Sequence, residues 1–392
     1  MHDLKQELKR TADEFGAPGV RFEDVRRVAD RRNGVRRVAA AVVALIVVAA
    51  SGSFLVRAFD GGTKVADTGL PGVENGPIAY STGGFRGGSV EGFHIGLTDP
   101  TGSETYSVAG YLSAGAWSVD GSTLAFVRDP VETPYGDMSI WTVHGDGTDV
   151  RQLTDRKEVN EGDYGPRWSP EGGHILFFRN HPDGAPTVMV MDADGTDVHR
   201  VAGAADQVFF TAIWSPDGSQ ILTVRDERGS VEGSPQWLAV IDADGSNEEV
   251  LVRGSLSQPQ WAPDGSEIFY YADGVVHAVS IAGSERTVID GIDRQGLSVF
   301  EASPDGTRML FTQPIGFDEG EELWIVDIDG SDPQRIAEGL HWREPSPTWS
   351  PDGSAIAFVR DSDIWTIDLE SGEQSQVTQA PEYETLPVWG AA

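Results

Sequence analysis

Trp214-Ser-Pro-Asp-Gly218 is one of six copies of a short pattern in this 392-residue chain. The other copies are WSVDG, WSPEG, WAPDG, ASPDG and WSPDG, at residues 117–121, 168–172, 261–265, 302–306 and 349–353. Their acidic positions are 51, 46, 47, 41 and 47 residues apart. Because this period is the length of one β-propeller blade, the repeat predicts an all-β propeller.

Each copy contains the residues of a tight turn between two strands. Proline sets φ at the first central position, aspartate accepts local hydrogen bonds, and glycine adopts the left-handed conformation. A fully apolar segment follows every copy, and strands of this kind must be covered on both faces. We predict these second strands at residues 124–127, 175–178, 221–224, 268–271, 309–312 and 356–359.

Two further strands complete each repeat. Third strands are predicted at residues 140–143, 188–191, 238–241, 323–326 and 364–367, and several run into a D-x-D-G turn. Short fourth strands follow, such as residues 151–154 and 376–378. Four antiparallel strands form a propeller blade.

The two ends of the repeat region set the number of blades. Residues 78–80 read as a second strand that lacks its first, and residues 386–389 read as a first strand that lacks its second. Joining them completes a mixed blade and leaves no open edge. We therefore predict seven blades with terminal strand closure.

The repeat over residues 76–390 resembles the repeats of the TolB family of propellers, on the pattern W-S-P-D-G, two apolar strands, D-A-D-G and a short strand. The resemblance implies a binding platform, since such propellers bind partners that include a peptidoglycan-associated lipoprotein. This chain differs from TolB itself in its seven blades, in its signal anchor and in the lack of a recognisable N-terminal α/β domain.

Residues 38–56 are nineteen consecutive uncharged residues, which predict a transmembrane helix. Six arginines precede the segment within residues 26–37, whereas only Arg57 and Lys64 follow it closely. The positive-inside rule then places residues 1–37 in the cytoplasm. We expect a linker at residues 57–75 and an extracytoplasmic propeller at residues 76–392. A cleaved signal peptide is the alternative.

The charge of the chain excludes one class of partner. Its net charge is −33, of which residues 57–392 contribute −36. Such an acidic domain repels phosphate backbones, so we expect no nucleic-acid binding. The absence of cysteine excludes disulfides, thiolate nucleophiles and cysteine zinc sites.

The sequence shows no catalytic motif. We find no G-x-S-x-G elbow, P-loop or H-E-x-x-H helix. The eight histidines are scattered over different repeats, and the D-x-D-G turns lack the later ligands of a calcium loop. We therefore predict no catalytic residue, no metal site and no cofactor.

Binding residues are expected on the axial loops that join the fourth strand of one blade to the first strand of the next. These candidates are Glu161, Asp163, Tyr164, Phe209, Phe210, Gln258, Arg294, Trp342, Arg343, Glu344, Tyr383 and Glu384. We expect a non-catalytic platform for an envelope protein, a peptide or a cell-wall glycan. The alternatives are a glycan hydrolase or lyase using carboxylates such as Glu161, Asp163 and Glu384, and a transmembrane sensor that relays through residues 1–37.

Overall fold

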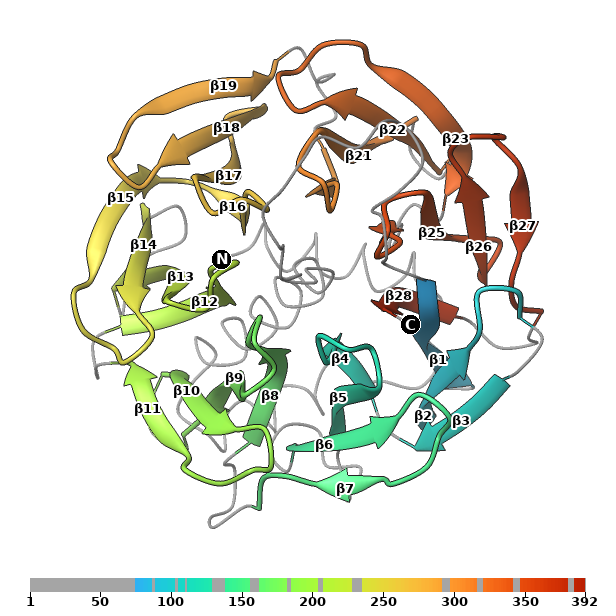
Figure 1. Cartoon of the computed structure of the whole chain (residues 1–392), viewed down its shortest axis with the longest axis horizontal. Coiled ribbons are helices and arrows are strands. Elements are labelled where there is room, and N and C mark those ends of the chain that lie inside the picture. Colours follow the sequence, from blue (N-terminus) through green and yellow to red (C-terminus); the bar gives the residue numbers. More distant parts are fainter. Residues whose placement is uncertain are drawn as a thin grey trace, which may run out of the picture.

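The computed structural model describes residues 75–86, 89–102, 105–109, 111–128, 138–155, 162–181, 185–203, 207–227, 235–290, 297–315, 320–340, 346–379 and 384–391. The strands within them form seven four-stranded sheets. Figure 1 shows these sheets as blades arranged in a ring about a central axis. The seven-bladed all-β propeller predicted from the repeat is therefore confirmed.

The strands of each blade are numbered first to fourth from the axis outward (Figure 1). Blade 1 contains β28 (Glu384–Ala391), β1 (Asn75–Arg86), β2 (Ser89–Thr98) and β3 (Thr105–Ala109). Blade 2 contains β4 (Tyr111–Trp117), β5 (Thr123–Arg128), β6 (Ser139–His144) and β7 (Arg151–Gln152). Blade 3 contains β8 (Gly162–Trp168), β9 (His174–Asn180), β10 (Thr187–Asp192) and β11 (His199–Ala202).

The remaining four blades follow the same order. Blade 4 contains β12 (Gln207–Trp214), β13 (Gln220–Glu227), β14 (Gln236–Asp242) and β15 (Glu249–Gly254). Blade 5 contains β16 (Ser257–Trp261), β17 (Glu267–Ala272), β18 (Val275–Ser280) and β19 (Glu285–Ile289). Blade 6 contains β20 (Phe300–Ala302), β21 (Arg308–Pro314), β22 (Glu321–Asp327) and β23 (Gln334–Leu340). Blade 7 contains β24 (Thr348–Trp349), β25 (Ala355–Arg360), β26 (Asp363–Asp368) and β27 (Gln374–Gln376).

The ring closes through its two terminal strands. The C-terminal strand β28 pairs antiparallel with β1, so that Trp389 lies opposite Ile78 and Val388 opposite Ala79. The same pairing supplies blade 1 with its first strand. The terminal strand closure predicted from the sequence is confirmed, and it ties residues about 310 positions apart into one sheet.

The repeated turn is held by its serine as well as by its glycine. In blade 4, Gly218 has φ +72° and its N–H donates to the Ser215 carbonyl at 2.9 Å. The Ser215 hydroxyl donates to the Asp217 carboxylate at 2.6 Å and accepts from the Gln220 N–H at 2.9 Å. The carboxylate also accepts from the N–H and hydroxyl of Ser219. Each turn residue therefore stabilises the start of the second strand.

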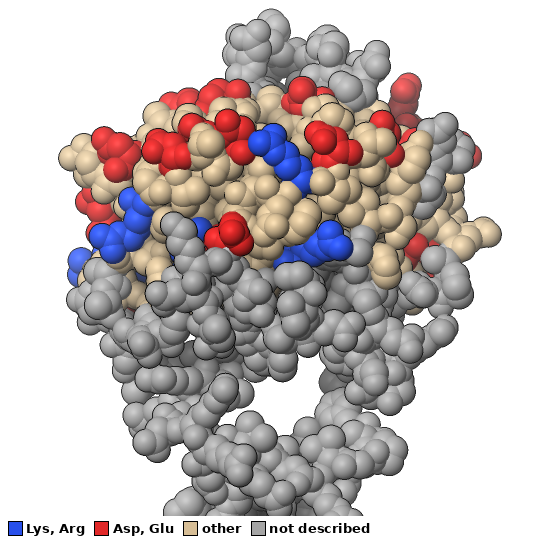
Figure 2. Space-filling view, turned by 90° about the horizontal axis from the view of Figure 1, so that it is seen from below, with Lys and Arg blue, Asp and Glu red and all other residues tan. Residues whose placement is uncertain are grey.

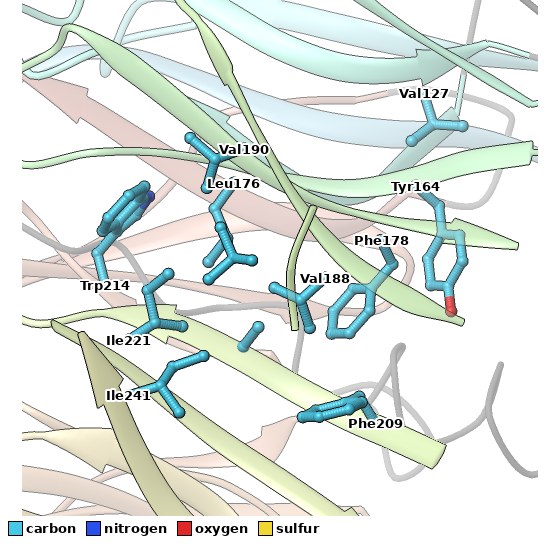
Figure 3. Close-up of a cluster of buried hydrophobic side chains, with 12 residues drawn as sticks. Val127, Tyr164, Leu176, Phe178, Val188, Val190, Phe209, Trp214, Ile221 and Ile241 are labelled. Atoms are coloured by element: carbon cyan, nitrogen blue, oxygen red, sulfur yellow. The ribbon is translucent and has the colours of Figure 1, made fainter. Parts of the chain in front are cut away.

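Tryptophans at the ends of the first strands link one blade to the one before it. Their indole N–H groups donate to carbonyls in the preceding blade: Trp117 to Val388 at 3.0 Å, Trp214 to Arg167 at 3.3 Å, Trp261 to Ile213 at 3.4 Å and Trp349 to Glu301 at 3.2 Å. The apolar faces between blades pack into the core, and Figure 3 shows this for the cluster between blades 3 and 4. These seams bury the fully apolar second strands on both faces.

Blade 6 meets blade 5 in another way, because Ala302 stands where the other copies have tryptophan. The amide of Gln260 on β16 donates to the Phe300 carbonyl and accepts from the Ala302 N–H. Gln258, two residues earlier, makes the same pair of bonds: its amide donates to the Ser298 carbonyl and accepts from the Phe300 N–H. Two glutamine amides thus replace one indole at this seam.

The predicted transmembrane helix lies outside the described residues. Among the residues that are described, no helix has the length and apolar character needed to cross a bilayer. The structure therefore shows the propeller, and the membrane segment at residues 38–56 stays a prediction.

We predict that Trp214→Phe destabilises the protein by about 1–2 kcal/mol more than Trp168→Phe. Both changes remove the same atoms from a buried first strand, but only Trp214 donates to a carbonyl, since the buried Trp168 indole N–H has no hydrogen-bond partner. Thermal unfolding of the full-length variants checks the order. Equal losses would show that the indole bonds do not stabilise the seams.

We predict that Gly121→Ala destabilises the ring closure, whereas Gly172→Ala costs only the strain of its positive φ. The two glycines have similar φ values of +67° and +76°. A Cβ on Gly121 would lie 1.6 Å from the Ala391 carbonyl oxygen, but a Cβ on Gly172 would meet nothing within 4 Å. Hydrogen exchange of β28 should increase in the first variant only. Unchanged exchange in both would argue against this contact as a closure element.

Candidate functional site

Acidic residues gather in the turns at one end of the propeller. Because neighbouring strands are antiparallel, the first-to-second and third-to-fourth turns all emerge at one end, which we call the turn end. These turns carry Asp120, Glu171, Asp217, Asp264, Asp305 and Asp352, and farther from the axis Asp146, Asp194, Asp244, Asp329 and Asp368. Figure 2 shows Asp and Glu gathered along the upper surface.

The turn carboxylates are held in the charged state. The hydroxyl of the residue two positions on donates to each of Asp146, Asp194, Asp244 and Asp329, and this bond lowers the pKa of each carboxyl below its usual value. The turn end is therefore a negatively charged surface over the whole physiological pH range. It is unsuited to polyanions, in agreement with the charge of the sequence.

The opposite end, which we call the loop end, is where the first strands begin. Of the predicted binding residues, Asp163, Tyr164, Phe209, Phe210, Gln258 and Glu384 lie in or at the start of first strands there. The other six, Glu161, Arg294, Trp342, Arg343, Glu344 and Tyr383, lie outside the described residues. The structure thus brings the described candidates from blades 1, 3, 4 and 5 to one end of the ring.

Asp163 has a structural partner. Its carboxylate forms a bidentate ion pair with Arg179, with Nε–Oδ1 at 2.7 Å and Nη2–Oδ2 at 2.8 Å, and only 5% of the residue is exposed. Its N–H donates to the Met138 carbonyl of blade 2. The neighbouring Tyr164 stacks on Phe178 with ring centroids 5.4 Å apart, and burial raises the pKa of the Tyr164 phenol. Together these contacts anchor the first strand of blade 3.

The candidates of blades 4 and 5 are also engaged within the fold. Phe209 is buried in the cluster between blades 3 and 4, on the same side as Tyr164 (Figure 3). Phe210 is partly buried against the cluster between blades 4 and 5. Gln258 has φ +53° and bonds blade 6 through its amide. Phe209 is therefore a core residue, and Phe210 is partly covered by the fold.

Glu384 begins the closing strand β28 and is buried, with 1% of the residue exposed. The Thr378 hydroxyl donates to its carboxylate, and its N–H donates to the Ser362 carbonyl of blade 7 at 3.0 Å. Burial, with a smaller effect from the charge of Asp363, raises the pKa of Glu384 to about 7. This carboxyl therefore exchanges its proton near neutral pH, at the junction of the first and last blades.

Polar residues that the sequence analysis did not name lie deeper in the ring. Arg167, Gln260, Glu301 and Thr348 each occupy the position before the Trp of the repeat, or before its Ala302 replacement, and all four are buried. Burial lowers the pKa of Arg167 to about 10. An alignment of the repeats would have revealed these four polar residues, because the other blades have the apolar residues Ala116, Ile213 and Val388 at this position.

Glu321 is a further buried carboxyl at the loop end. The Ser298 hydroxyl donates to its Oε1 at 2.7 Å, whereas its Oε2 has no hydrogen-bond partner. Burial raises its pKa above the usual value. Within the part of the chain that the structure describes, no group of three or more His, Asp or Glu side chains is arranged to hold a metal ion.

We predict that stability falls by up to about 3 kcal/mol as the pH rises from about 5 to 8, because Glu384 binds its proton more tightly in the folded than in the unfolded state. Glu384→Gln should remove this part of the pH dependence and be more stable than the parent at pH 8. Unfolding temperatures at the two pH values check this. Glu370→Gln, in an exposed turn, is the control, and a parallel pH response of parent and Glu384→Gln would contradict the assignment.

Known proteins resemble the chain over the same region. The TolB beta propeller domain matches residues 97–295 and 231–392. Dipeptidyl-peptidase 5 of Porphyromonas gingivalis is 23% identical over 310 residues, which is 71% of this chain and 43% of that protein. The chain spans 48%, 43% and 17% of the lengths of three curated relatives it matches, so it corresponds to less than half of each.

Solved structures share the fold. TolB from Acinetobacter baumannii superposes with a TM-score of 0.52 at 14% identity, over 77% of this chain and 80% of that one. Oligogalacturonate lyase in complex with manganese gives 0.57 at 15% identity, over 79% and 86%. At such identities the likeness shows the fold alone. From the domain match over most of its length, the chain belongs to the TolB beta propeller domain family.

Proposed function

We propose that this protein is a membrane-tethered, extracytoplasmic and non-catalytic binding platform, which recognises an envelope protein, a peptide or a cell-wall glycan at its loop end. One observation carries the proposal. Two carboxylates predicted to bind at this end, Asp163 and Glu384, are described, and both have partners inside the fold. Arg179 donates to Asp163, and Thr378 donates to Glu384. These side chains are therefore not available for a ligand, and we assign recognition to the loops at this end.

The same observation weighs against glycan hydrolysis by Asp163 and Glu384. Glycosidases need one carboxyl as acid and a second as nucleophile or base, both facing the sugar. Asp163 is neutralised by a bidentate arginine and Glu384 is buried. A peptidase activity is the second candidate, favoured by the sequence resemblance to dipeptidyl-peptidase 5.

The place where the chain enters the propeller supports display of the loop end. The strand β1 is a second strand, so it begins at the turn end, and the Asn75 side-chain oxygen accepts from the Asp352 N–H of a blade 7 turn. A tether formed by residues 38–56 and the linker would therefore join the acidic turn end. The loop end would then face away from the point of attachment, where a partner can reach it.

We predict that affinity capture from native membranes with the full-length protein enriches one envelope protein or wall fragment. Trp342→Ala and Tyr383→Ala should weaken this capture at least tenfold, because aromatic side chains on loops contribute most to such surfaces. Val198→Ala is the matched control, since Val198 is exposed in a turn at the other end.

Two results would oppose the proposal. If Val198→Ala weakens capture as much as the loop variants do, the loop end is not the binding surface. If nothing is enriched and the protein instead cleaves a peptide or polysaccharide library, the catalytic candidate replaces the platform.

A further inference from the structure

An arginine occupies the same repeat position, eight residues after the acidic turn residue and at or near the end of the second strand, in four blades: Arg128, Arg179, Arg225 and Arg360. Each guanidinium lies over an aromatic ring of its own blade, at 4.1 to 5.5 Å from the ring centroid. Among the residues that the structure describes, two of the four have a carboxylate partner: Asp163 for Arg179, and Glu248 for Arg225 at 2.7 Å. The arginine is therefore a repeated structural position, and its counter-ion differs between blades.

Blade 7 has a neutral residue where blade 4 has the counter-ion. In blade 4, Val240 pairs with Glu249, so Glu248 lies just before this pair. In blade 7, Thr366 pairs with Ser375, and Gln374 takes the corresponding place. The Arg360 Nη1 group accordingly donates to the Gln374 amide oxygen at 2.7 Å.

The second hydrogen bond of Arg360 also has an uncharged acceptor. Its Nη2 group donates to the Glu338 backbone carbonyl at 2.9 Å, and the guanidinium lies over the neighbouring rings of Phe358 and Trp365. Among the described residues, no carboxylate lies at ion-pair distance from Arg360. Burial lowers its pKa, and the charges of the nearby Asp361 and Glu338 carboxylates act in the opposite direction. The guanidinium nonetheless stays protonated at neutral pH.

This arginine lies in a groove between blades 6 and 7. The groove is lined by Arg335, Ile336, Ala337, Glu338, Arg360 and Gln374, and it follows the outer strand β23. The third-to-fourth turns of blades 6 and 7 differ in how closely they approach the preceding blade. A Cβ on Gly372 would meet nothing within 4 Å, whereas one on Gly330 in blade 6 would lie 2.1 Å from the Val288 carbonyl oxygen of blade 5.

We propose that this groove is an oxyanion site, which binds a carboxylate or phosphate group of a ligand against Arg360. Each Nη nitrogen of Arg360 carries a second proton beyond the one used internally, and the Gln374 amide has another, since its first donates to the Ile336 carbonyl. Arg335 lies on the rim, where its Nη1 contacts Glu322 and Glu338. A planar guanidinium suits both oxyanions.

The substitution Gln374→Glu tests the site by supplying the counter-ion that blade 4 already has. The full-length protein is titrated with inorganic phosphate and separately with glucuronate, at constant ionic strength held with chloride, and binding is measured by calorimetry. We expect saturable one-to-one binding of at least one anion, weakened at least tenfold in Gln374→Glu. The stronger of the two anions identifies the type of ligand group.

Gln379→Glu is the matched control, because it adds the same charge to an exposed residue outside the groove. It should bind the anion as the parent does. No saturable binding by the parent, or equal binding by Gln374→Glu, would overturn the proposal. If Gln374→Glu fails to fold, Arg360→Gln replaces it, and unchanged binding in that variant would overturn the proposal in the same way.

Discussion

The hydrogen bond from a first-strand indole to a carbonyl of the preceding blade is the contact on which the ring depends. It helps to fix the distance and the register between blades at four seams, where the indole at the end of the first strand of blades 2, 4, 5 and 7 donates to a carbonyl of the preceding blade. The bond is buried, so leaving its carbonyl unpaired would cost more than the bond itself contributes. The apolar second strands pack across the same seams.

The seams tolerate different solutions to the same constraint. Trp389 of the closing strand donates within its own blade, to the Gly76 carbonyl on β1. The seam of blades 5 and 6 uses the amides of Gln258 and Gln260 in place of an indole. The seam of blades 6 and 7 keeps the Trp349 bond near the axis and has a groove farther out, lined in part by Arg360 and Gln374. The contacts between blades therefore vary along the ring, and a groove between two blades is one place where this fold can form a binding site.

The turn chemistry also separates the two ends of the molecule. Aspartate is used in the turns because its carboxylate accepts the N–H and hydroxyl groups of the residues around it, and the propeller topology collects all these turns at one end. The result is a charged surface that arises from local folding requirements. The loop end does not contain these tight turns, so its residue types are not set by turn formation and can vary with the binding partner.

The repeat in the sequence was sufficient for the number of blades, the strands, the turns and the closure, because all of these follow from local periodicity and from the pairing of neighbouring segments. It was not sufficient for the partners of individual side chains. Asp163 and Glu384 read as exposed loop carboxylates, but Arg179 pairs with the first and the fold buries the second. The sequence also did not show that Gln374 stands beside Arg360 where blade 4 has a glutamate, because the two blades can be compared only once the pairing of their outer strands is known. Local patterns determine which elements form, whereas burial and charge pairing depend on contacts between elements and across blades, and only the tertiary structure decides these.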